Sequence, residues 1–540
     1  MKIYSIPVLL LLAGSILAQS NEGIPDSEVD IIKTFEPTLI KADKIPINPS
    51  LPKIVADKPE KQTYAFTEKN VPIEYKAEDI KPMKYSPPKA DPLPIVYLKA
   101  GFGTQFTPIA QLSITNRKWE KLKAGLNTDF IMSNGKKPEN KDYLNFSTKG
   151  WGAFQVNYNT IGVDANVGMR RYNYYGLNEN DTLSPQDSTK IKYNDFGLKL
   201  SLFNHEDNRL GLNYKGTFGV NWMNNHFAQK EILISGDADV SKNFKEKFDI
   251  GLMFNANNMI INNGKGNTST FGVTLTPYAK IKLGIWSLQA GPSIIHVGGD
   301  IYGAPYLKNE IAIYKNYLVM YNHWIATHRQ QDMIAMTKLN PFLSADTRYG
   351  INVTEERTFA GLKGAFPKGF AYDVRFTQWI EKNTLLFQYD TADAIVNNFT
   401  TVSEKRLSYF DIHSSLKYDW KGKLNAHADF DYFLYNTETQ AQAWYRPQMQ
   451  VQIGANYIHN KKFSAGMEFN IINGLKTLDD SLAITTLKPI VDININANYY
   501  LNKHIGFFAE LNNAIAQQYK RWYNYPSYGI QCLAGVKITY

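Results

Sequence analysis

The final segment of the chain, SYGIQCLAGVKITY (527–540), alternates between apolar and polar or small residues. Its alternate positions from Ile530 to Tyr540 are apolar or small, and among the intervening positions only Leu533 is large and apolar. Successive side chains of a β-strand point to opposite faces, so this segment predicts a strand with one apolar face. The same alternation recurs in FGLKLSLF (196–203), FDIGLMFN (248–255) and VDININAN (491–498). A pattern repeated over most of the chain predicts an all-β fold.

The first residues, MKIYSIPVLLLLAGSILAQS, have the organisation of a secretory signal peptide. Lys2 supplies the positive charge, Ile6 to Leu17 form the apolar stretch, and Ala18 is the small residue before the expected cleavage point. The apolar stretch is too short for a transmembrane helix. We therefore predict that residues 1–18 are removed during secretion and that the mature chain begins at Gln19.

The composition excludes several classes of protein. Beyond the signal peptide there is no run of about 18 apolar residues, and the mean hydropathy is -0.35, so a helical membrane protein is excluded. Cys532 is the only cysteine, which excludes a disulfide scaffold. The net charge of +9 is spread over 540 residues without a Lys/Arg block, so nucleic-acid binding is not predicted. A soluble β-sandwich array and a β-barrel remain, because both dilute apolar positions with polar ones.

Residues 19–93 differ from the rest of the chain because they are rich in proline and charge. Proline fixes φ and removes a backbone donor, so this segment is predicted to be extended and unpacked. One apolar island, EVDIIKTFEPTLI (28–40), lies within it. We predict that its large apolar side chains bind a partner, as an added strand or in an apolar groove: Val29, Ile31, Ile32, Phe35 and Leu39. The alternative for this island is a terminus without fixed structure.

From residue 94 to residue 540 the predicted strands are joined by connections of two kinds. Short turns fall at NHEDNR (204–209), NFKEK (243–247), HNKKF (459–463) and NKH (502–504). Longer polar or aromatic loops fall at SNGKKPENKD (133–142), LNENDTLSPQDST (177–189), MIINNGKGNTS (259–269), TETQAQAWYRP (437–447) and LKTLDDSLAITT (475–486). Short turns at one end and long loops at the other are typical of an outer-membrane barrel.

We therefore predict a transmembrane antiparallel β-barrel over residues 94–540, preceded by the extended Pro-rich segment. The turns divide it into about 22 strands, and merged hairpins would lower that number to about 16. An even number of strands places both ends of the barrel on one side, which is predicted to be periplasmic. Aromatic residues near the predicted strand ends indicate interfacial girdles: Trp151, Tyr172, Tyr174, Tyr175, Trp222, Trp286, Trp324, Trp420, Trp444 and Trp522.

Parts of the chain resemble a known family. FFAELNNAIAQQYKRWYNYPSYGIQCLAGVKITY (507–540) resembles the closing hairpin of a TonB-dependent receptor, with an LNN turn, a tyrosine-rich tip and a PSYG start to the terminal strand. VDIIKTFEPTLI (29–40) and YLKAGFGTQFTPIAQLSIT (97–115) resemble the start of receptor-like barrels that lack the plug domain. The resemblance implies an outer-membrane location within lipid, a periplasmic N-terminal segment and a TonB-type energy-coupling partner. It also implies a barrel-assembly signal formed by Val536, Ile538 and Tyr540.

The sequence carries no catalytic signature. GxSxG, HExxH, P-loop and CxxC motifs are all missing, so neither enzyme activity nor a cofactor is predicted. His323 and His328 are five residues apart, which on a regular strand places them on opposite faces, and a metal site is not predicted. Asp479 and Asp480 are interpreted as exposed loop carboxylates rather than a cation site. A hydrolase with a Ser/His pair from distant strands is the enzymatic alternative.

Two functions are consistent with these predictions. The first is transport, in which the barrel admits or binds a solute that loop aromatics contact: Trp444, Tyr445, Tyr523 and Tyr525. The same aromatics alternatively serve only as interfacial anchors. The second function is that of a structural or accessory subunit, which joins an outer-membrane complex through residues 28–40. A wide barrel without a plug would leak unless it is filled or capped, and this favours the second function.

Overall fold

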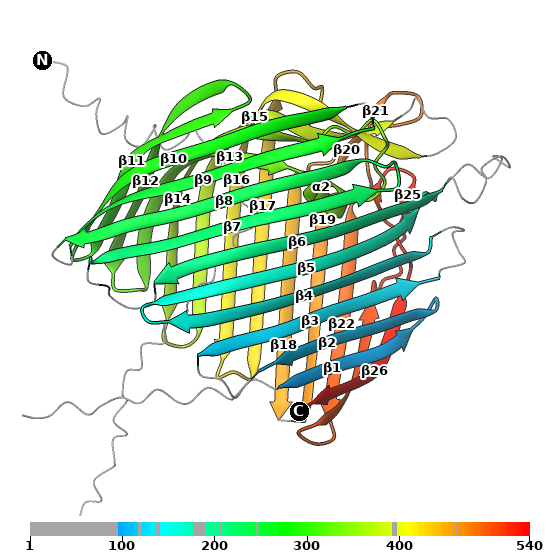
Figure 1. Cartoon of the computed structure of the whole chain (residues 1–540). Coiled ribbons are helices and arrows are strands. Elements are labelled where there is room, and N and C mark those ends of the chain that lie inside the picture. Colours follow the sequence, from blue (N-terminus) through cyan, green and yellow to red (C-terminus); the bar gives the residue numbers. More distant parts are fainter. Residues whose placement is uncertain are drawn as a thin grey trace, which may run out of the picture. The chain divides into compact units, whose positions relative to one another are not determined.

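The computed structural model contains a closed barrel of strands (Figure 1). It describes residues 95–116, 121–134, 141–175, 189–204, 208, 210–244, 247–264, 266–390, 397–460 and 462–540, without the side chains of residues 353–356. The signal peptide, the Pro-rich segment and the island at 28–40 lie outside the described residues, so their roles stay predictions.

The barrel contains 22 strands, numbered with the small loop strands in chain order. They are β1 (Val96–Gly103), β2 (Thr107–Thr115), β3 (Leu122–Ser133), β4 (Tyr143–Val156), β5 (Asn159–Asn173), β6 (Lys190–Asn204), β7 (Leu212–Asn225), β8 (Lys230–Phe244), β9 (Phe248–Asn262), β10 (Asn267–Leu283), β11 (Trp286–Val297), β12 (Asp300–Tyr314), β13 (Leu318–Gln331), β14 (Gly350–Phe366), β15 (Phe370–Asp390), β16 (Asn398–Trp420), β17 (Leu424–Thr437), β18 (Met449–Asn460), β19 (Phe463–Asn473), β22 (Ile490–Tyr500), β23 (Ile505–Asn512) and β26 (Gln531–Thr539). Two hairpins lie in the loops, β20 (Lys476–Leu478) with β21 (Ile484–Thr486) and β24 (Lys520–Trp522) with β25 (Tyr525–Pro526).

Each barrel strand pairs antiparallel with its neighbours in chain order, and the last strand closes the ring against the first. β26 pairs with β23 on one side and with β1 on the other, and Figure 1 shows β1 and β26 adjacent. A sheet must close on itself to span a lipid bilayer, because backbone N–H and C=O groups at an open edge would find no hydrogen-bond partner in the hydrocarbon. The predicted all-β antiparallel barrel and its number of strands are confirmed.

The outer face of the barrel is apolar and the inner face is mixed. Large apolar side chains at alternate positions of β5, β6 and β9 are exposed: Ile161, Val163, Val167, Phe196, Leu198, Leu200, Leu202, Ile250, Leu252 and Phe254. Residues of the opposite parity, such as Tyr193 and Asp195 on β6 and Asn257 and Met259 on β9, are buried. Exposed apolar residues in a continuous band are those of a barrel that faces lipid. Val536, Ile538 and Tyr540 are exposed on the outside of the last strand, and their role in assembly stays a prediction.

The two ends of the barrel carry different connections. At the end that holds Val96 and Tyr540, the terminal end, turns are short, as at 157–158, 315–317 and 421–423. At the opposite end, the loop end, long connections span 332–349, 474–489 and 513–530. The predicted asymmetry is confirmed.

One predicted loop is largely strand. The prediction of a long loop at 259–269 is wrong, because β9 continues to Asn262 and β10 begins at Asn267. Met259 and Ile261 are buried in an inner cluster with Leu233 and Ile295, and their packing extends the ladder to the end of the hairpin.

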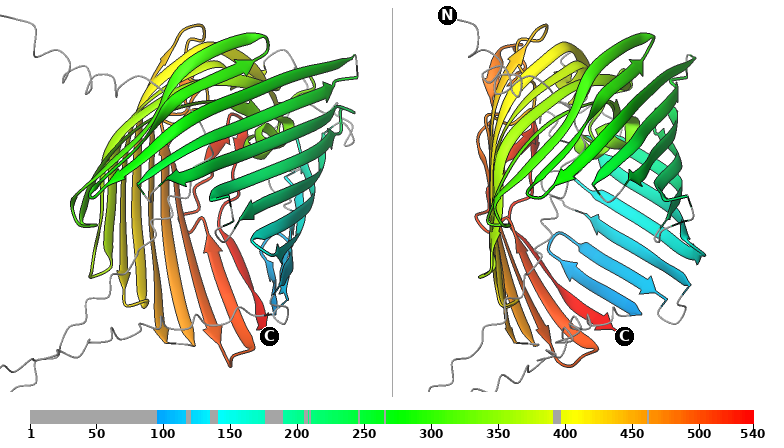
Figure 2. Two further views of the ribbon diagram at one scale, coloured as in Figure 1. Left: turned by 60° about the vertical axis from the view of Figure 1, so that its left-hand side comes forward. Right: turned by 90° about the vertical axis from the view of Figure 1, so that its left-hand side faces the viewer.

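The short helix α2 (Met333–Leu339) belongs to the connection between β13 and β14. Both views of Figure 2 place it within the ring of strands. The connection that carries α2 therefore enters the lumen instead of extending away from the barrel. Among the described residues, no helix is long and apolar enough to span a membrane.

The seam between β1 and β26 depends on two glycines that face each other, Gly101 and Gly535. A Cβ atom added to Gly535 would lie 2.1 Å from the Ala100 carbonyl oxygen. We expect Gly535→Val to strain closure by about 1–3 kcal/mol and to deplete the heat-modifiable form on unheated gels. The control is Gly303→Val on β12, where an added Cβ meets no atom within 4 Å. Equal heat-modifiable bands in both variants would contradict a close-packed seam.

Candidate functional site

Loops fold inward and fill part of the loop end of the barrel. Their side chains join inward-facing wall residues in one buried cluster: Tyr193, Met223, Trp379, Phe399 and Tyr409 from the wall, and Met333, Met336, Leu343, Trp444, Tyr445, Leu475, Trp522 and Tyr525 from the loops. The rings of Phe342 and Tyr525 stack at 3.8 Å, and those of Tyr445 and Trp522 lie 4.8 Å apart. Loops that are far apart in the sequence thus share one apolar core inside the barrel.

Helix α2 is attached to the inner wall by polar contacts. The Met333 amide donates to Glu231 Oε2 on β8 at 2.7 Å, and Asp332 caps the helix by accepting from the Ala335 amide. On the other side, Arg170 Nη2 on β5 donates to the Thr337 hydroxyl at 3.0 Å. The helix is therefore fixed to two separated parts of the wall.

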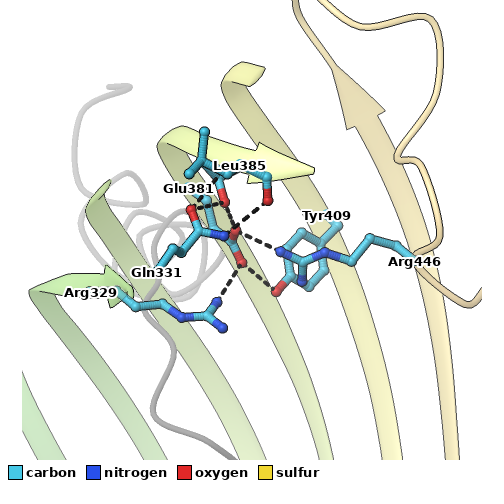
Figure 3. A network of polar contacts seen from close by, with 7 residues as sticks. Arg329, Gln331, Glu381, Leu385, Tyr409 and Arg446 are labelled. Carbon is cyan, nitrogen blue, oxygen red and sulfur yellow. Dashed lines mark hydrogen bonds and ion pairs between the residues drawn. The ribbon is translucent and has the colours of Figure 1, made fainter. Parts of the chain in front are cut away.

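A buried carboxylate holds the connection between β17 and β18, as Figure 3 shows. Glu381 on β15 has no exposed side-chain surface, and its Oε2 accepts from Arg446 Nη2 at 3.0 Å. The Tyr409 hydroxyl donates to Oε1 at 3.0 Å, and Arg329 Nη1 lies 3.8 Å from the same oxygen. We call Glu381 with Arg329, Tyr409 and Arg446 the Glu381 latch. Because Arg446 belongs to the loop 438–448, the latch ties that loop to the wall.

Two further contacts surround the latch. The Gln331 side chain pairs with the backbone of Leu385 in both directions, at 2.7 and 2.9 Å (Figure 3). Glu404 on β16 accepts from the amides of Glu438, Thr439 and Gln440 at 2.7–3.2 Å. The start of the loop 438–448 is therefore held by its own backbone amides, and its far end is held by Arg446.

The structure places the predicted ligand-contacting aromatics inside the loop end. Trp444, Tyr445 and Tyr525 are buried, and Tyr523 is half-buried with its hydroxyl 3.2 Å from Asp480 Oδ2. They are not exposed loop tips, because the inward-folded loops bury their rings. The prediction that aromatic residues form an interfacial girdle is wrong for Tyr174, Trp444 and Trp522, which lie in the buried cluster at the loop end. Contact with a ligand stays a prediction for these side chains.

The prediction that His323 and His328 face opposite sides is wrong. A β-bulge between Ile325 and Thr327 shifts the parity of β13. His323 lies 3.7 Å from Glu310, and His328 bonds to Asn257 and Thr274 at 2.7 Å, all on the inner side. Their partners differ, and no group of three His, Cys, Asp or Glu side chains suited to a metal occurs in the described part of the chain.

Two of the cavities inside the described part of the barrel adjoin each other. The outer cavity, of about 490 Å³, lies at the loop end between the β3–β4 and β23–β26 connections. The lumen cavity, of about 1130 Å³, lies below it, against the inner wall and α2. Tyr172 and Asn512 line both cavities, so these two side chains mark the boundary between them.

The wall of the lumen cavity carries charges of both signs. Lys99 Nζ and Glu510 Oε1 are 2.6 Å apart, and Lys149 lies 3.0 Å from Asp164. Other charged lining residues are Asp129, Arg170, Asp195, Lys199, Asp332 and Lys338. Paired charges make the lumen hydrophilic without a field that strongly selects one sign of charge.

The sequence patterns did not single out the outer cavity. Lys141 and Asp142 end the loop predicted at 133–142, and Tyr528 belongs to the PSYG motif, but no spacing joins the two segments. Lys141 is buried, and its Nζ lies 4.1 Å from the Tyr528 ring centroid and 5.2 Å from that of Tyr175. Burial lowers the pKa of Lys141 to about 7, whereas the two rings favour the charged form.

No protein-family model and no curated protein sequence matches this chain. Solved structures do. The FrpB iron transporter of Neisseria meningitidis (F5-1 variant) is 11% identical, with a TM-score of 0.62 over 84% of this chain and 83% of its own. Fiu, the ferric-catecholate import receptor of E. coli K12, is 10% identical, with a TM-score of 0.60 over 84% and 82%. The copper transporter OprC is 10% identical, with a TM-score of 0.58 over 84% and 82%. This chain therefore shares the fold of these transporters and receptors, and the predicted resemblance is confirmed for the fold.

The Glu381 latch predicts a specific loosening of the loop 438–448. Glu381→Gln removes the charge that faces Arg446 and Arg329 inside the barrel, which costs about 3 kcal/mol. We expect chymotryptic cleavage after Trp444 to speed up by roughly a hundredfold while the barrel stays heat-modifiable. The control is Glu438→Gln, because the Glu438–Lys405 pair is exposed at 41% and 69% and stabilises little. Equal cleavage in the two variants would contradict the latch.

Lys141 predicts a pH dependence of stability. Its pKa of about 7 in the folded chain lies below the ordinary value of about 10.4, so the unfolded chain binds the proton more tightly. Stability is therefore expected to be lowest below about pH 7 and to rise above it. Lys141→Met should flatten this rise, measured as the temperature of the gel shift at each pH. Exposed Lys520→Met is the control, and a slope retained in Lys141→Met would refute this role.

Proposed function

We propose that this chain is an outer-membrane barrel that takes up a solute through its outer and lumen cavities, with its N-terminal segment in the periplasm. The proposal rests on one observation: the outer and lumen cavities adjoin at Tyr172 and Asn512, which line both, and the inner wall of the lumen cavity carries polar and charged side chains. The fold shared with an iron transporter, a ferric-catecholate import receptor and a copper transporter supports the transport class.

In this proposal the inward-folded loops take the place of a plug. A lumen enclosed by 22 strands is too wide for wall side chains to fill, and a wide barrel of this kind needs a filling element. The α2 connection and the loop 438–448 are packed and bonded to the wall, so they form the fixed part of the closure. Passage then requires the connections around the outer cavity to separate.

The second candidate is the structural or accessory subunit. The buried aromatic cluster that closes part of the loop end favours it, because a barrel packed in this way conducts little. In both candidates the island at 28–40 binds a partner, which is a TonB-type energy-coupling protein in the first and another envelope protein in the second.

Deleting residues 26–40 separates the two candidates. The barrel should assemble and stay heat-modifiable, because the predicted assembly signal lies at Tyr540. If the chain is a transporter, a strain that lacks it grows poorly on one limiting nutrient. We then expect the full-length chain, but not the deletion variant, to restore growth of that strain. For an accessory subunit we expect loss of a stoichiometric partner in mild-detergent purification, with uptake unchanged. A null strain without any uptake defect would overturn transport, and a deletion that keeps both partner and activity would overturn the role of the island.

A further inference from the structure

The outer cavity combines aromatic rings with amides and carboxylates. Tyr143 and Tyr528 stand 6.2 Å apart at one side, and Tyr175 lies 5.6 Å from Phe342 at another. These four rings come from β4, from the residues after β5, from the α2 connection and from the β23–β26 connection. Rings on several walls offer flat apolar surfaces to a compact ligand. The volume of about 490 Å³ lies within the ~300–1,000 Å³ of small-molecule sites.

The polar groups of the outer cavity are mainly neutral amides and two carboxylates. Asn494 and Asn512 are half-buried on the wall, and Asn494 Oδ1 accepts from the Asn513 amide at 3.1 Å. Asp492 Oδ1 is buried and has no hydrogen-bond partner among the described residues, although Oδ2 lies 3.5 Å from the Tyr519 hydroxyl. Because Asp492 lines the cavity and its Oδ2 is engaged only at this long distance, the carboxylate has acceptor capacity for a ligand hydroxyl.

The charges of the outer cavity disfavour an anionic ligand. Among the described lining residues, Lys141 is the only basic side chain, and it donates to the Pro526 carbonyl beneath the rings of Tyr528 and Tyr175. The carboxylates Asp142 and Asp492 face the cavity without a second cation among those residues. An anion there would meet two negative groups and an ammonium that is already engaged.

We propose that the outer cavity binds a neutral saccharide. Sugar hydroxyls donate to carboxylates and both donate to and accept from amides, which matches Asp492, Asn494 and Asn512. The apolar faces of sugar rings fit the tyrosine rings. The inference rests on the proposed function in one respect, since it names the class of solute that the barrel takes up. Binding itself does not require that function.

The test uses the full-length barrel purified in an oxyethylene detergent, which has no sugar headgroup. Calorimetric titration with maltotriose, cellotriose, xylotriose and triacetylchitotriose is expected to show binding of at least one. Asp492→Asn should weaken that binding on the order of tenfold, because a charged acceptor becomes neutral at constant shape. Asp373→Asn is the matched control and should leave the affinity unchanged, because Asp373 is a half-buried carboxylate that accepts from the Tyr321 hydroxyl and lines neither cavity.

A second pair of variants tests the position of the site. Gly529 lines the outer cavity, and a Cβ atom added there meets no atom within 4 Å, so the ring of Gly529→Phe should occupy space in the cavity. Gly266 in the β9–β10 turn is equally open, and Gly266→Phe is the control. We expect Gly529→Phe to abolish saccharide binding and Gly266→Phe to preserve it.

The outcomes separate this inference from the proposed function. Absence of binding for all four saccharides overturns the saccharide site, even where uptake is retained. Binding of a ferric catecholate or of triglycine that Gly529→Phe abolishes, without saccharide binding, also overturns it. Saccharide binding that depends on Asp492 and Gly529 supports the site, even in a strain that shows no uptake defect and therefore contradicts transport.

Discussion

The pairing of β26 with β1 closes 22 strands into a ring, and the width of that ring determines what the loops must do. The diameter of a barrel grows with the number of strands, so wall side chains alone cannot fill this lumen. Aromatic rings in the loops at the open end of the barrel can contact either water or one another. Burial of Trp444, Tyr445 and Tyr525 in a shared cluster removes them from water, and this draws the loops inward.

Apolar burial alone does not specify which loop lies where, and the buried polar contacts supply that specificity. Glu381 accepts from Arg446 and Tyr409, and a shifted loop would leave its charge without these donors. Glu404 fixes the start of the same loop through three consecutive backbone amides. The inner faces of the wall strands therefore also position the loops, because they carry the hydrogen-bond acceptors to which the loops bind.

The parts of the fold that depend on local sequence could be predicted, and those that depend on distant contacts could not. Alternation predicts the outer face, because a period of two is a property of neighbouring residues. The bulge between Ile325 and Thr327 breaks that period, so His323 and His328 lie on the same face although their spacing predicts opposite faces. The latch joins Glu381 to Arg446, and the outer cavity joins Lys141 to Tyr528, and nothing in the local pattern relates these pairs. Aromatics near strand ends likewise do not reveal whether they turn toward lipid or into the lumen.

The outer cavity lies between the β3–β4 and β23–β26 connections, whose described residues meet through Lys141, Tyr528 and Pro526. A ligand that contacts both connections stabilises their closed arrangement by its differential affinity for it. Tyr172 and Asn512 line both spaces, so in the proposed uptake a ligand that moves toward the lumen cavity passes these two side chains. Under the proposed function, tight binding keeps these side chains close to the ligand whereas passage moves them aside, and a partner that supplies energy would favour the second arrangement.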